Sequence, residues 1–369
     1  MGHVERARAR LSRGQELLND PALTGEDTRR EEAFVWWRLG RMLFDVDRAR
    51  ARPLYERSLA RYRALDDRWA TANVLDDLSW VARYRGDYED ERGLAGESLA
   101  LRQALEDARG VSRALRALSS VALLQGRLAE AEQLIQESAA LPLQGGSRGE
   151  IADRLSGKGW ILGMLGRFGD GERLLGASVA LWEKLGVSKM VAMIGIPLGF
   201  MRLHRGRSAE ARALLQSGLG VAREIGDRGR TGFGLFLLSW VALAEGAYAE
   251  ADELLRESAA LFRELGQRDE GGQVSALSGY AALGRNQYRQ AQAHLRAALH
   301  VGADLHAYLP IMFALPAVAW FAADQGQPER AVELYARASR CPFVANSRWF
   351  EDVVGERIAA VTDGLPSAV

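Results

Sequence analysis

The stretch that decides the fold reads Leu78-Ser79-Trp80-Val81-Ala82-Arg83-Tyr84-Arg85-Gly86-Asp87-Tyr88. Its outline returns every 40 residues, most clearly in the column that holds Gly86: Val46, Gly86, Gly126, Gly166, Gly206, Gly246, Asn286 and Gly326. Glycine, with asparagine as its usual substitute, is expected where a helix ends in a left-handed backbone conformation. The column therefore predicts a helix that stops at the same place in each repeat.

Two further columns describe how the helices pack. Five residues after the turn stands a small side chain, at Ala51, Ala131, Ala211, Ala251, Ala291 and Ala331, with Glu91 and Gly171 in the other two units. Eight residues after the turn stand Leu54, Leu94, Leu134, Leu174, Leu214, Leu254 and Leu334, interrupted by His294. A small residue at a fixed place indicates that a second helix, after the turn, approaches the first closely.

One unit illustrates the pattern. The range 68–85 carries apolar residues at helical spacing, and a second stripe runs from the turn to about Leu105. We call the helix before the turn A and the helix after it B. A two-helix unit cannot bury both faces alone, so neighbouring units must complete its core. The sequence predicts an all-α fold, a right-handed α-solenoid (superhelix) of about eight antiparallel helical hairpins with a 40-residue period.

The chain divides into a central array and two ends. Residues 1–27 are expected to form an N-terminal capping helix and linker, and 342–369 a C-terminal capping helix and tail, with Asn346-Ser347 starting a helix over 348–361. The proline- and glycine-containing stretch 142–147 is the expected hinge. The repeat array spans 28–341, in units near 28–67, 68–107, 108–147, 148–187, 188–227, 228–267, 268–305 and 306–341.

Composition narrows the class of partner. Lysine plus arginine and aspartate plus glutamate both number 48, so no long-range field favours nucleic acid or an acidic membrane. The single cysteine, Cys341, cannot form an intramolecular disulfide, which fits a reducing compartment. No apolar run approaches the ~20 residues that cross a bilayer, and the N-terminus lacks a signal-peptide core. We expect a soluble cytoplasmic protein.

The repeat resembles the tetratricopeptide repeat (TPR). Glycine at the turn, an aromatic residue two positions later as in Tyr88, the small residue and the leucine carry this resemblance. The period of 40 and the stretch around Leu78-Ser79-Trp80 look like the long variant found in bacterial STAND signalling proteins, such as maltose-type transcriptional activators and their LuxR-type relatives. The resemblance implies a repeat arm of a signalling or transcription regulator, whose parent carries an ATPase or DNA-binding domain outside this chain.

Motifs for chemistry do not stand out. Gly157-Lys158 lacks the neighbouring residues of a phosphate loop, and His294, His300 and His306 are spaced by six rather than by the four that a metal-binding helix needs. A serine returns every 40 residues at Ser58, Ser98, Ser138 and Ser178, and again at Ser258, which indicates packing rather than catalysis. We therefore expect no enzyme activity, no cofactor and no metal site.

One face of the A helices is the candidate ligand site. The candidates are Asn73, Asp76, Trp80, Tyr84, Arg113, Arg116, Trp160, Phe200, Phe233, Phe236, Trp240, Tyr280 and Trp320. In the resembled family this face lines a concave groove, and an aromatic groove with a charged mouth would suit a peptide. The alternative is that these aromatic side chains simply pack between successive A helices.

Three functions remain open at this point. The first is a non-enzymatic scaffold that binds a protein or peptide in the groove, as a sensing arm. The second is a sensor of a small-molecule effector, because aromatic stacking also suits sugar rings. The third is a self-assembling or spacer solenoid without a groove ligand.

Overall fold

A computed structural model describes residues 9, 12–14, 16, 27–44, 48–142 and 146–362. Every regular element among these residues is helical, so the predicted all-α class is confirmed. The elements are α2 (Arg29–Leu43), α3 (Arg48–Ala64), α4 (Arg68–Arg85), α5 (Tyr88–Ala104), α6 (Ala108–Leu124), α7 (Leu128–Ala140), α8 (Arg148–Met164), α9 (Phe168–Lys184), α10 (Ser188–His204), α11 (Ser208–Glu224), α12 (Arg228–Ala244), α13 (Tyr248–Glu264), α14 (Arg268–Gly284), α15 (Tyr288–Asp304), α16 (Tyr308–Asp324), α17 (Pro328–Ala338), α18 (Pro342–Ala345), α19 (Arg348–Phe350), the π-helix η2 (Glu351–Gly355) and α20 (Glu356–Thr362).

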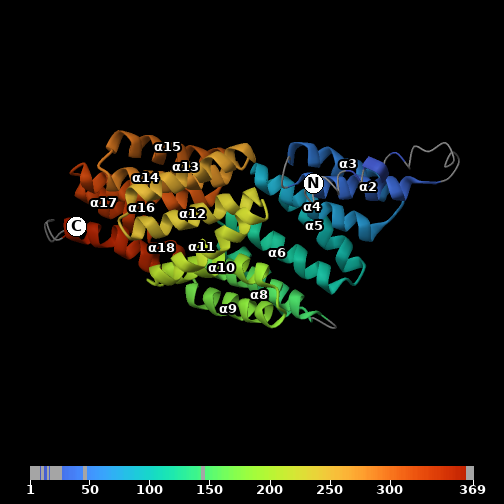
Figure 1. The fold of residues 1–369 in the computed structure, drawn as a ribbon. Helices are drawn as coiled ribbons and strands as arrows, with labels where there is room; N and C mark the ends of the chain where they lie inside the picture. The colour runs from blue at the N-terminus through green and yellow to red at the C-terminus, as the bar shows by residue number, and fades with distance from the viewer. Residues whose placement is uncertain are drawn as a thin grey trace. The chain divides into compact units, whose positions relative to one another are not determined.

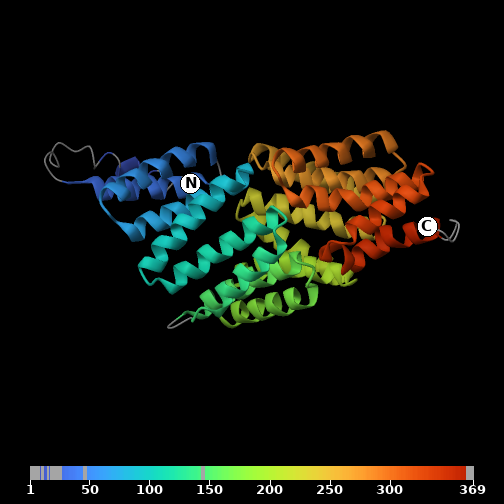
Figure 2. The ribbon, with the colours of Figure 1, turned by 180° about the vertical axis from the view of Figure 1, so that it is seen from behind.

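Consecutive helices pack as antiparallel hairpins, the arrangement of an α-solenoid (Figures 1 and 2). The A helices α4, α8, α10, α12, α14 and α16 begin 40 residues apart or a multiple of it. The paired helices are α2 with α3, α4 with α5, α8 with α9, α10 with α11, α12 with α13, α14 with α15 and α16 with α17. The chain forms two compact units, unit 1 (Met1–Val121) and unit 2 (Ala122–Val369).

The turn column behaves as the sequence predicts. Gly86 ends α4 at φ +80° and accepts the left-handed conformation that other residues adopt at a cost, and Asn286 replaces glycine at φ +58°. A second column of positive φ, which the sequence analysis did not identify, joins most B helices to the next A helix: Asp66, Glu106, Gly186, Gly226, Gly266 and His306. Only half of these residues are glycine, so composition alone marks this turn weakly.

Helices A and B of one hairpin meet through the small column and the serine column. The alanines Ala51, Ala131, Ala211, Ala251, Ala291 and Ala331 are fully buried. Four serines of the B helices donate to a carbonyl of the A helix before them: Ser58 to Ala33 (2.7 Å), Ser98 to Ala72 (3.3 Å), Ser178 to Ala152 (2.8 Å) and Ser258 to Gly232 (2.8 Å). Each bond pairs a hydroxyl that the hairpin buries. The serines are packing residues, as predicted.

The C-terminal part departs from the expectation. Ser347 caps a helix by accepting from the Phe350 amide, as predicted, but the helix expected over 348–361 is divided by the π-helix η2. α20 lies against the last hairpin, α16 and α17, and η2 also contacts α16, whereas α19 packs against α10. Residues 1–27, where a capping helix is expected, and the expected hinge at 142–147 lie largely outside the described residues.

No helix in the described ranges is both long enough and apolar enough to cross a membrane.

Candidate functional site

The A helices of unit 1 present a face that is both aromatic and charged. On α4, Trp69, Asn73, Asp76, Trp80 and Tyr84 follow one another at intervals of four or three residues, which places them on one side of the helix. Trp69 is 57% exposed and Trp80 is 41% exposed. With Arg113 and Arg116 of α6 these residues form what we call the α4–α6 face. Large aromatic side chains that remain this exposed are typical of interaction surfaces.

Trp80 is held in place by Arg83, which contacts one face of its ring. The guanidinium carbon of Arg83 lies 4.5 Å from the centre of the Trp80 ring, a cation–π contact. Arg83 Nε donates to Glu91 Oε1 (2.8 Å), and its Nη1 donates to the hydroxyl of Ser120 (2.6 Å). Tyr84 lies beside Trp80, with ring centres 6.1 Å apart. The exposed indole therefore rests on a fixed support.

Glu91 is the acidic member of a buried ion pair. Its side chain is 1% exposed and that of Arg83 12%. Burial raises the pKa of Glu91, and the charge of Arg83 opposes this rise. The two positions are a leucine and an alanine in most other repeats, for example Leu243 and Ala251. The repeat formed by α4 and α5 thus has an ion pair where most other repeats have apolar residues.

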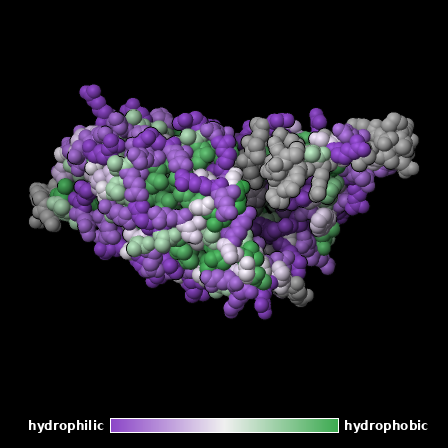
Figure 3. All heavy atoms as spheres, in the orientation of Figure 1, coloured by the Kyte–Doolittle hydropathy of each residue, from purple (hydrophilic) through white to green (hydrophobic). Residues whose placement is uncertain are grey.

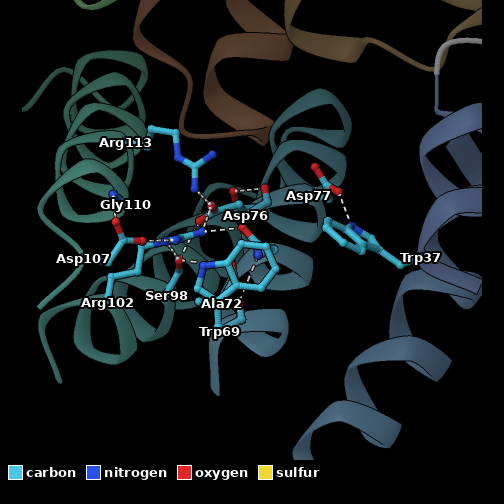
Figure 4. A network of polar contacts seen from close by, with 12 residues as sticks. Trp37, Trp69, Ala72, Asp76, Asp77, Ser98, Arg102, Asp107, Gly110 and Arg113 are labelled. Atoms are coloured by element: carbon cyan, nitrogen blue, oxygen red, sulfur yellow. Dashed lines mark hydrogen bonds and ion pairs between the residues drawn. The ribbon is translucent and has the colours of Figure 1, made fainter. Parts of the chain in front are cut away.

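A second polar network lies under the same face (Figure 4). Arg102 of α5 is fully buried and donates to Asp76 Oδ2 (2.6 Å), Asn73 Oδ1 (3.0 Å) and Asp107 Oδ2 (2.7 Å). Arg113 approaches the same Asp76 oxygen at 3.7 Å from the exposed side. Burial acts to raise the pKa of Asp107, but hydrogen bonds from the backbone amide of Gly110 and from Arg102 outweigh it, so this pKa is lowered. The network fixes a carboxylate at the centre of the face.

A hollow of about 580 Å³ adjoins this face at α2. Phe34, Trp37, Tyr62 and Trp69 line it, and Trp69 is shared between the hollow and the α4–α6 face. Trp37 Nε1 donates to Asp77 Oδ2 (2.6 Å), as Figure 4 shows. Burial raises the pKa of Asp77, and this hydrogen bond partly offsets the rise. The hollow offers stacking surface next to fixed charges.

In unit 2 the structure places most of the predicted column in the core. Phe200, Phe236, Trp240, Tyr280 and Trp320 are at most 3% exposed, and only Trp160 and Phe233 are partly exposed. Rings of successive repeats contact one another: the ring centres of Trp160 and Phe200 are 5.9 Å apart, and those of Phe200 and Trp240 are 5.5 Å apart. These side chains offer no open groove, because other rings cover them; the packing alternative describes this part of the column.

The cover comes from the C-terminal part of the chain. Trp349 lies 4.5 Å from Trp240 between ring centres, and Phe343 lies 6.1 Å from Phe200. The repeat pattern could not predict this burial, because the covering residues lie outside the array and more than 100 positions away in sequence.

The predicted candidates thus separate by unit. Asn73, Asp76, Trp80, Tyr84, Arg113 and Arg116 share one face, although Asn73 is itself 8% exposed and serves the Arg102 network. Sequence analysis missed Trp69, Arg102 and the pairing of Arg83 with Glu91. Trp69 extends the helical spacing of Asn73 and Asp76 by one turn, and Arg83 and Glu91 interrupt two apolar columns in the same repeat, so both signals were present.

The molecular surface agrees with a mainly polar exterior. On the side shown in Figure 3, hydrophilic side chains predominate, and hydrophobic ones show in small groups between them. Among the described residues, no group of histidine, cysteine, aspartate and glutamate side chains is arranged to hold a metal ion.

Comparison with known sequences supports the resemblance for one part of the chain. Residues 31–104 match the sequence profile of the tetratricopeptide repeat, and this range contains α4 and α5 with the Trp80 and Arg102 clusters. No curated protein matches the chain.

Solved structures show the same fold over most of the chain. A Rap protein in complex with the competence and sporulation factor has a TM-score of 0.62 at 14% identity, over 82% of this chain and 85% of that one. The apo form of RapI has a TM-score of 0.53 at 12% identity, over 74% and 98%. A STAND protein with a TPR sensor from Pyrococcus horikoshii has a TM-score of 0.50 at 13% identity, over 92% of this chain; the chain spans 53% of that protein's length. The tetratricopeptide-like fold is therefore confirmed.

Proposed function

We propose that this chain is a non-enzymatic binding module that takes a protein or peptide segment on the α4–α6 face of unit 1. The observation that carries the proposal is the exposure of Trp69 and Trp80 on a face where buried polar networks fix Asp76 and also Arg83, which supports Trp80. A tryptophan supported in one orientation loses little conformational entropy when a partner covers it. The face is thus ready to bind without rearrangement.

The chemistry of the face defines the partner. Trp80 and Tyr84 offer aromatic surface for an apolar or aromatic side chain, while Asp76 and Arg113 offer charges of both signs to orient the backbone or polar side chains. A segment with an apolar anchor flanked by charged residues complements this arrangement.

A regulatory role is part of the proposal. The fold is shared with a Rap protein crystallised with the competence and sporulation factor and with the TPR sensor of a STAND protein. We place this chain as the sensing arm of a comparable bacterial regulator, whose ATPase or DNA-binding parts would lie outside it. Binding on the α4–α6 face would then be the signal that the arm reports.

A small-molecule effector is the second candidate. The aromatic hollow of about 580 Å³ beside Trp69 favours it, because pockets for small ligands commonly measure ~300–1,000 Å³ and are lined by aromatic side chains. A ring-shaped ligand could stack on Trp69 or Phe34, and the ion pair between Arg30 and Asp67 at the rim could orient its polar groups.

Selection from a random peptide library on the immobilised protein tests the first candidate. Peptides selected on the wild-type chain should bind the Trp80→Ala variant at least ~10-fold more weakly, because a tryptophan that becomes buried in an interface carries a large share of the binding energy. Ile225→Ala is the matched control: Ile225 is also 41% exposed but lies in unit 2. It should leave binding unchanged. Peptides that bind all three proteins equally would refute the site, and an effector screen that yields ligands sensitive only to Trp69→Ala would favour the second candidate.

A further inference from the structure

The C-terminal segment (Pro342–Thr362) leaves the last hairpin and, from Asn346 on, crosses the A helices of unit 2 in order. Phe343, before this stretch, lies between α10 and α16, with its ring centre 6.1 Å from that of Phe200 and 5.8 Å from that of Phe313. At the turn between α8 and α9, Asn346 Nδ2 donates to the carbonyl of Gly166 (3.3 Å), 180 residues earlier in sequence. At α10, the Ser347 hydroxyl lies 2.6 Å from His204 Nδ1. Asn346 and Ser347 thus lie against α8–α10, several repeats before the last hairpin of the array.

The same progression continues through the next three A helices. Trp349 Nε1 donates to the carbonyl of Trp240 in α12 (2.8 Å), and its ring lies 5.4 Å from that of Tyr280 in α14. The Arg357 guanidinium lies 4.2 Å above the ring of Trp320 in α16. Successive residues of one segment therefore meet successive repeats, which is the way a peptide ligand lies across a repeat array.

Three aromatic anchors hold the segment. Phe343 and Phe350 are fully buried, and Trp349 is 1% exposed. Phe343 contacts Phe168 at 5.2 Å between ring centres. Central aromatic anchors surrounded by a few polar contacts are the pattern of binding hot spots in protein interfaces. By this pattern, Phe343, Trp349 and Phe350 supply most of the attachment.

The repeats approach the segment closely at two turns, and at one of them they approach its backbone. A Cβ atom on Gly166 would lie 2.3 Å from the carbonyl oxygen of Pro342, and one on Gly206 would lie 3.2 Å from the side chain of Arg348. The equivalent turns at Gly246 and Gly326 have nothing within 4 Å. Glycine thus suits the left-handed backbone conformation at all four turns, and at Gly166 it also leaves room for the backbone of the segment.

Two polar atoms of the repeats remain unsatisfied where the segment covers them. His204 Nε2 and Trp240 Nε1 are buried and have no hydrogen-bond partner among the described residues. Both side chains contact the anchors, His204 with Phe343 at 4.7 Å and Trp240 with Phe350 at 5.8 Å. A buried polar group without a partner weakens the association that buries it. The resident segment therefore satisfies this surface incompletely.

We propose that the A-helix side of unit 2 is a peptide-recognition surface and that the C-terminal segment is its ligand, bound within the same chain. The ligand class is a peptide with phenylalanine followed, six residues later, by Trp-Phe, as in Phe343, Trp349 and Phe350. A partner with this pattern, or one that also pairs His204 and Trp240, replaces the segment. This surface is separate from the α4–α6 face and does not depend on the function proposed for it.

Cleavage of the full-length chain tests the proposal. A protease recognition sequence is inserted after Arg340, which is exposed, and the purified protein is cut there. The probe is a fluorescent synthetic peptide of residues 342–362, added in excess. We expect the cut chain to keep its helical circular dichroism signal. We also expect the peptide to replace the original segment, and fluorescence anisotropy and size-exclusion chromatography measure this exchange.

Two variant peptides make the readout specific. The Trp349→Ala peptide should bind at least ~10-fold more weakly than the wild type, because it lacks the central anchor. The Glu356→Ala peptide is the matched control and should bind as the wild type does, because Glu356 is exposed. Equal binding of all three peptides, or loss of helicity on cleavage, would mean that the segment is ordinary core and would overturn the proposal.

Hydrogen exchange of the unmodified chain provides an independent measurement. Backbone amides of 342–362 should exchange through a local opening and therefore faster than the amides of α12. Adding unlabelled 342–362 peptide should not slow the exchange of the α12 amides. If the segment and α12 exchange at one common rate, the segment opens only when unit 2 unfolds, and the proposal is wrong.

Discussion

At the scale of single residues, the repeat formed by α4 and α5 differs from the other repeats by charges placed at apolar positions. Arg83 and Glu91 occupy columns that hold leucine and alanine elsewhere, and Arg102 brings a buried guanidinium to Asp76. Buried charges cost desolvation energy that a paired geometry only partly offsets. Here the buried charges hold other side chains in place: Arg83 supports Trp80, and Arg102 fixes the carboxylate of Asp76.

The buried pair yields a test of this interpretation. Glu91→Ala leaves Arg83 buried without its partner and should lower the free energy of unfolding by about 3–5 kcal/mol. The double variant Arg83→Leu, Glu91→Ala restores the apolar pair of the other repeats and should be within about 1 kcal/mol of the wild type. Urea unfolding measures both. A double variant as unstable as Glu91→Ala would show that the pair does more than replace an apolar contact.

His204 predicts a pH dependence for unit 2. Burial among Phe168, Phe200, Trp240, Phe343 and Phe350 lowers the pKa of His204 to about 3, well below its ordinary value of 6.5. The unfolded chain then binds the additional proton, so this contribution to stability is complete above pH 6.5 and is lost as the pH falls towards 3. Between pH 7.5 and 5 the loss should be about 2 kcal/mol.

A ring without a titratable nitrogen serves as the control. His204→Phe keeps an aromatic side chain but removes the titration, so its stability should fall less between pH 7.5 and 5 than that of the wild type. Thermal melting at several pH values measures the difference. Parallel pH profiles for the two proteins would assign the acid sensitivity to other groups.

At the scale of elements, each hairpin is fixed by where its helices end. The turn after the A helix uses positive φ in every described repeat, with glycine or asparagine, and the B-helix serine bonds to an A-helix carbonyl in four of them. Pro197 and Pro316 lie inside α10 and α16, so the hairpin tolerates a missing backbone donor. Local sequence therefore determines the hairpin.

Two equivalent helix ends separate turn geometry from contact with the C-terminal segment. Gly246→Ala introduces a Cβ into open space at φ +73° and should cost about 1–2 kcal/mol for the left-handed backbone alone. Gly166→Ala, at φ +81°, should cost at least about 1 kcal/mol more, because its Cβ meets the backbone of Pro342. Chemical denaturation of both variants measures the difference. Equal losses would show that the Pro342 contact relaxes freely.

At the scale of the whole molecule, apolar residues form two clusters among the described residues. One contains Leu75 and Val74 of unit 1, and the other contains Leu215 and Trp240 of unit 2. Repeat proteins with separate clusters lose the all-or-none unfolding of a small domain. The two units are therefore expected to unfold in separate transitions.

One substitution in each cluster tests this expectation. Leu75→Ala and Leu215→Ala each remove a fully buried side chain and should cost about 2–5 kcal/mol. In urea titrations followed by circular dichroism, each should shift a different transition and leave the other in place. A single transition that both variants shift would show that the chain unfolds as one cooperative body.

The sequence by itself determined the hairpin and its repetition. The glycine column, the alanine column and the serine column act between residues of one hairpin, so a 40-residue pattern is enough to predict them. The same reasoning reached the α4–α6 face, because Asn73, Asp76, Trp80 and Tyr84 follow one helix.

Only the tertiary structure decided which aromatic residues remain exposed. Trp80 and Trp240 hold the same place in their repeats, yet Trp80 is 41% exposed and Trp240 is fully buried. The difference comes from Trp349 and Phe350, which contact Trp240 although they lie more than 100 residues away in sequence. Burial depends on everything that packs against a side chain, and the repeat pattern records only its neighbours within the array.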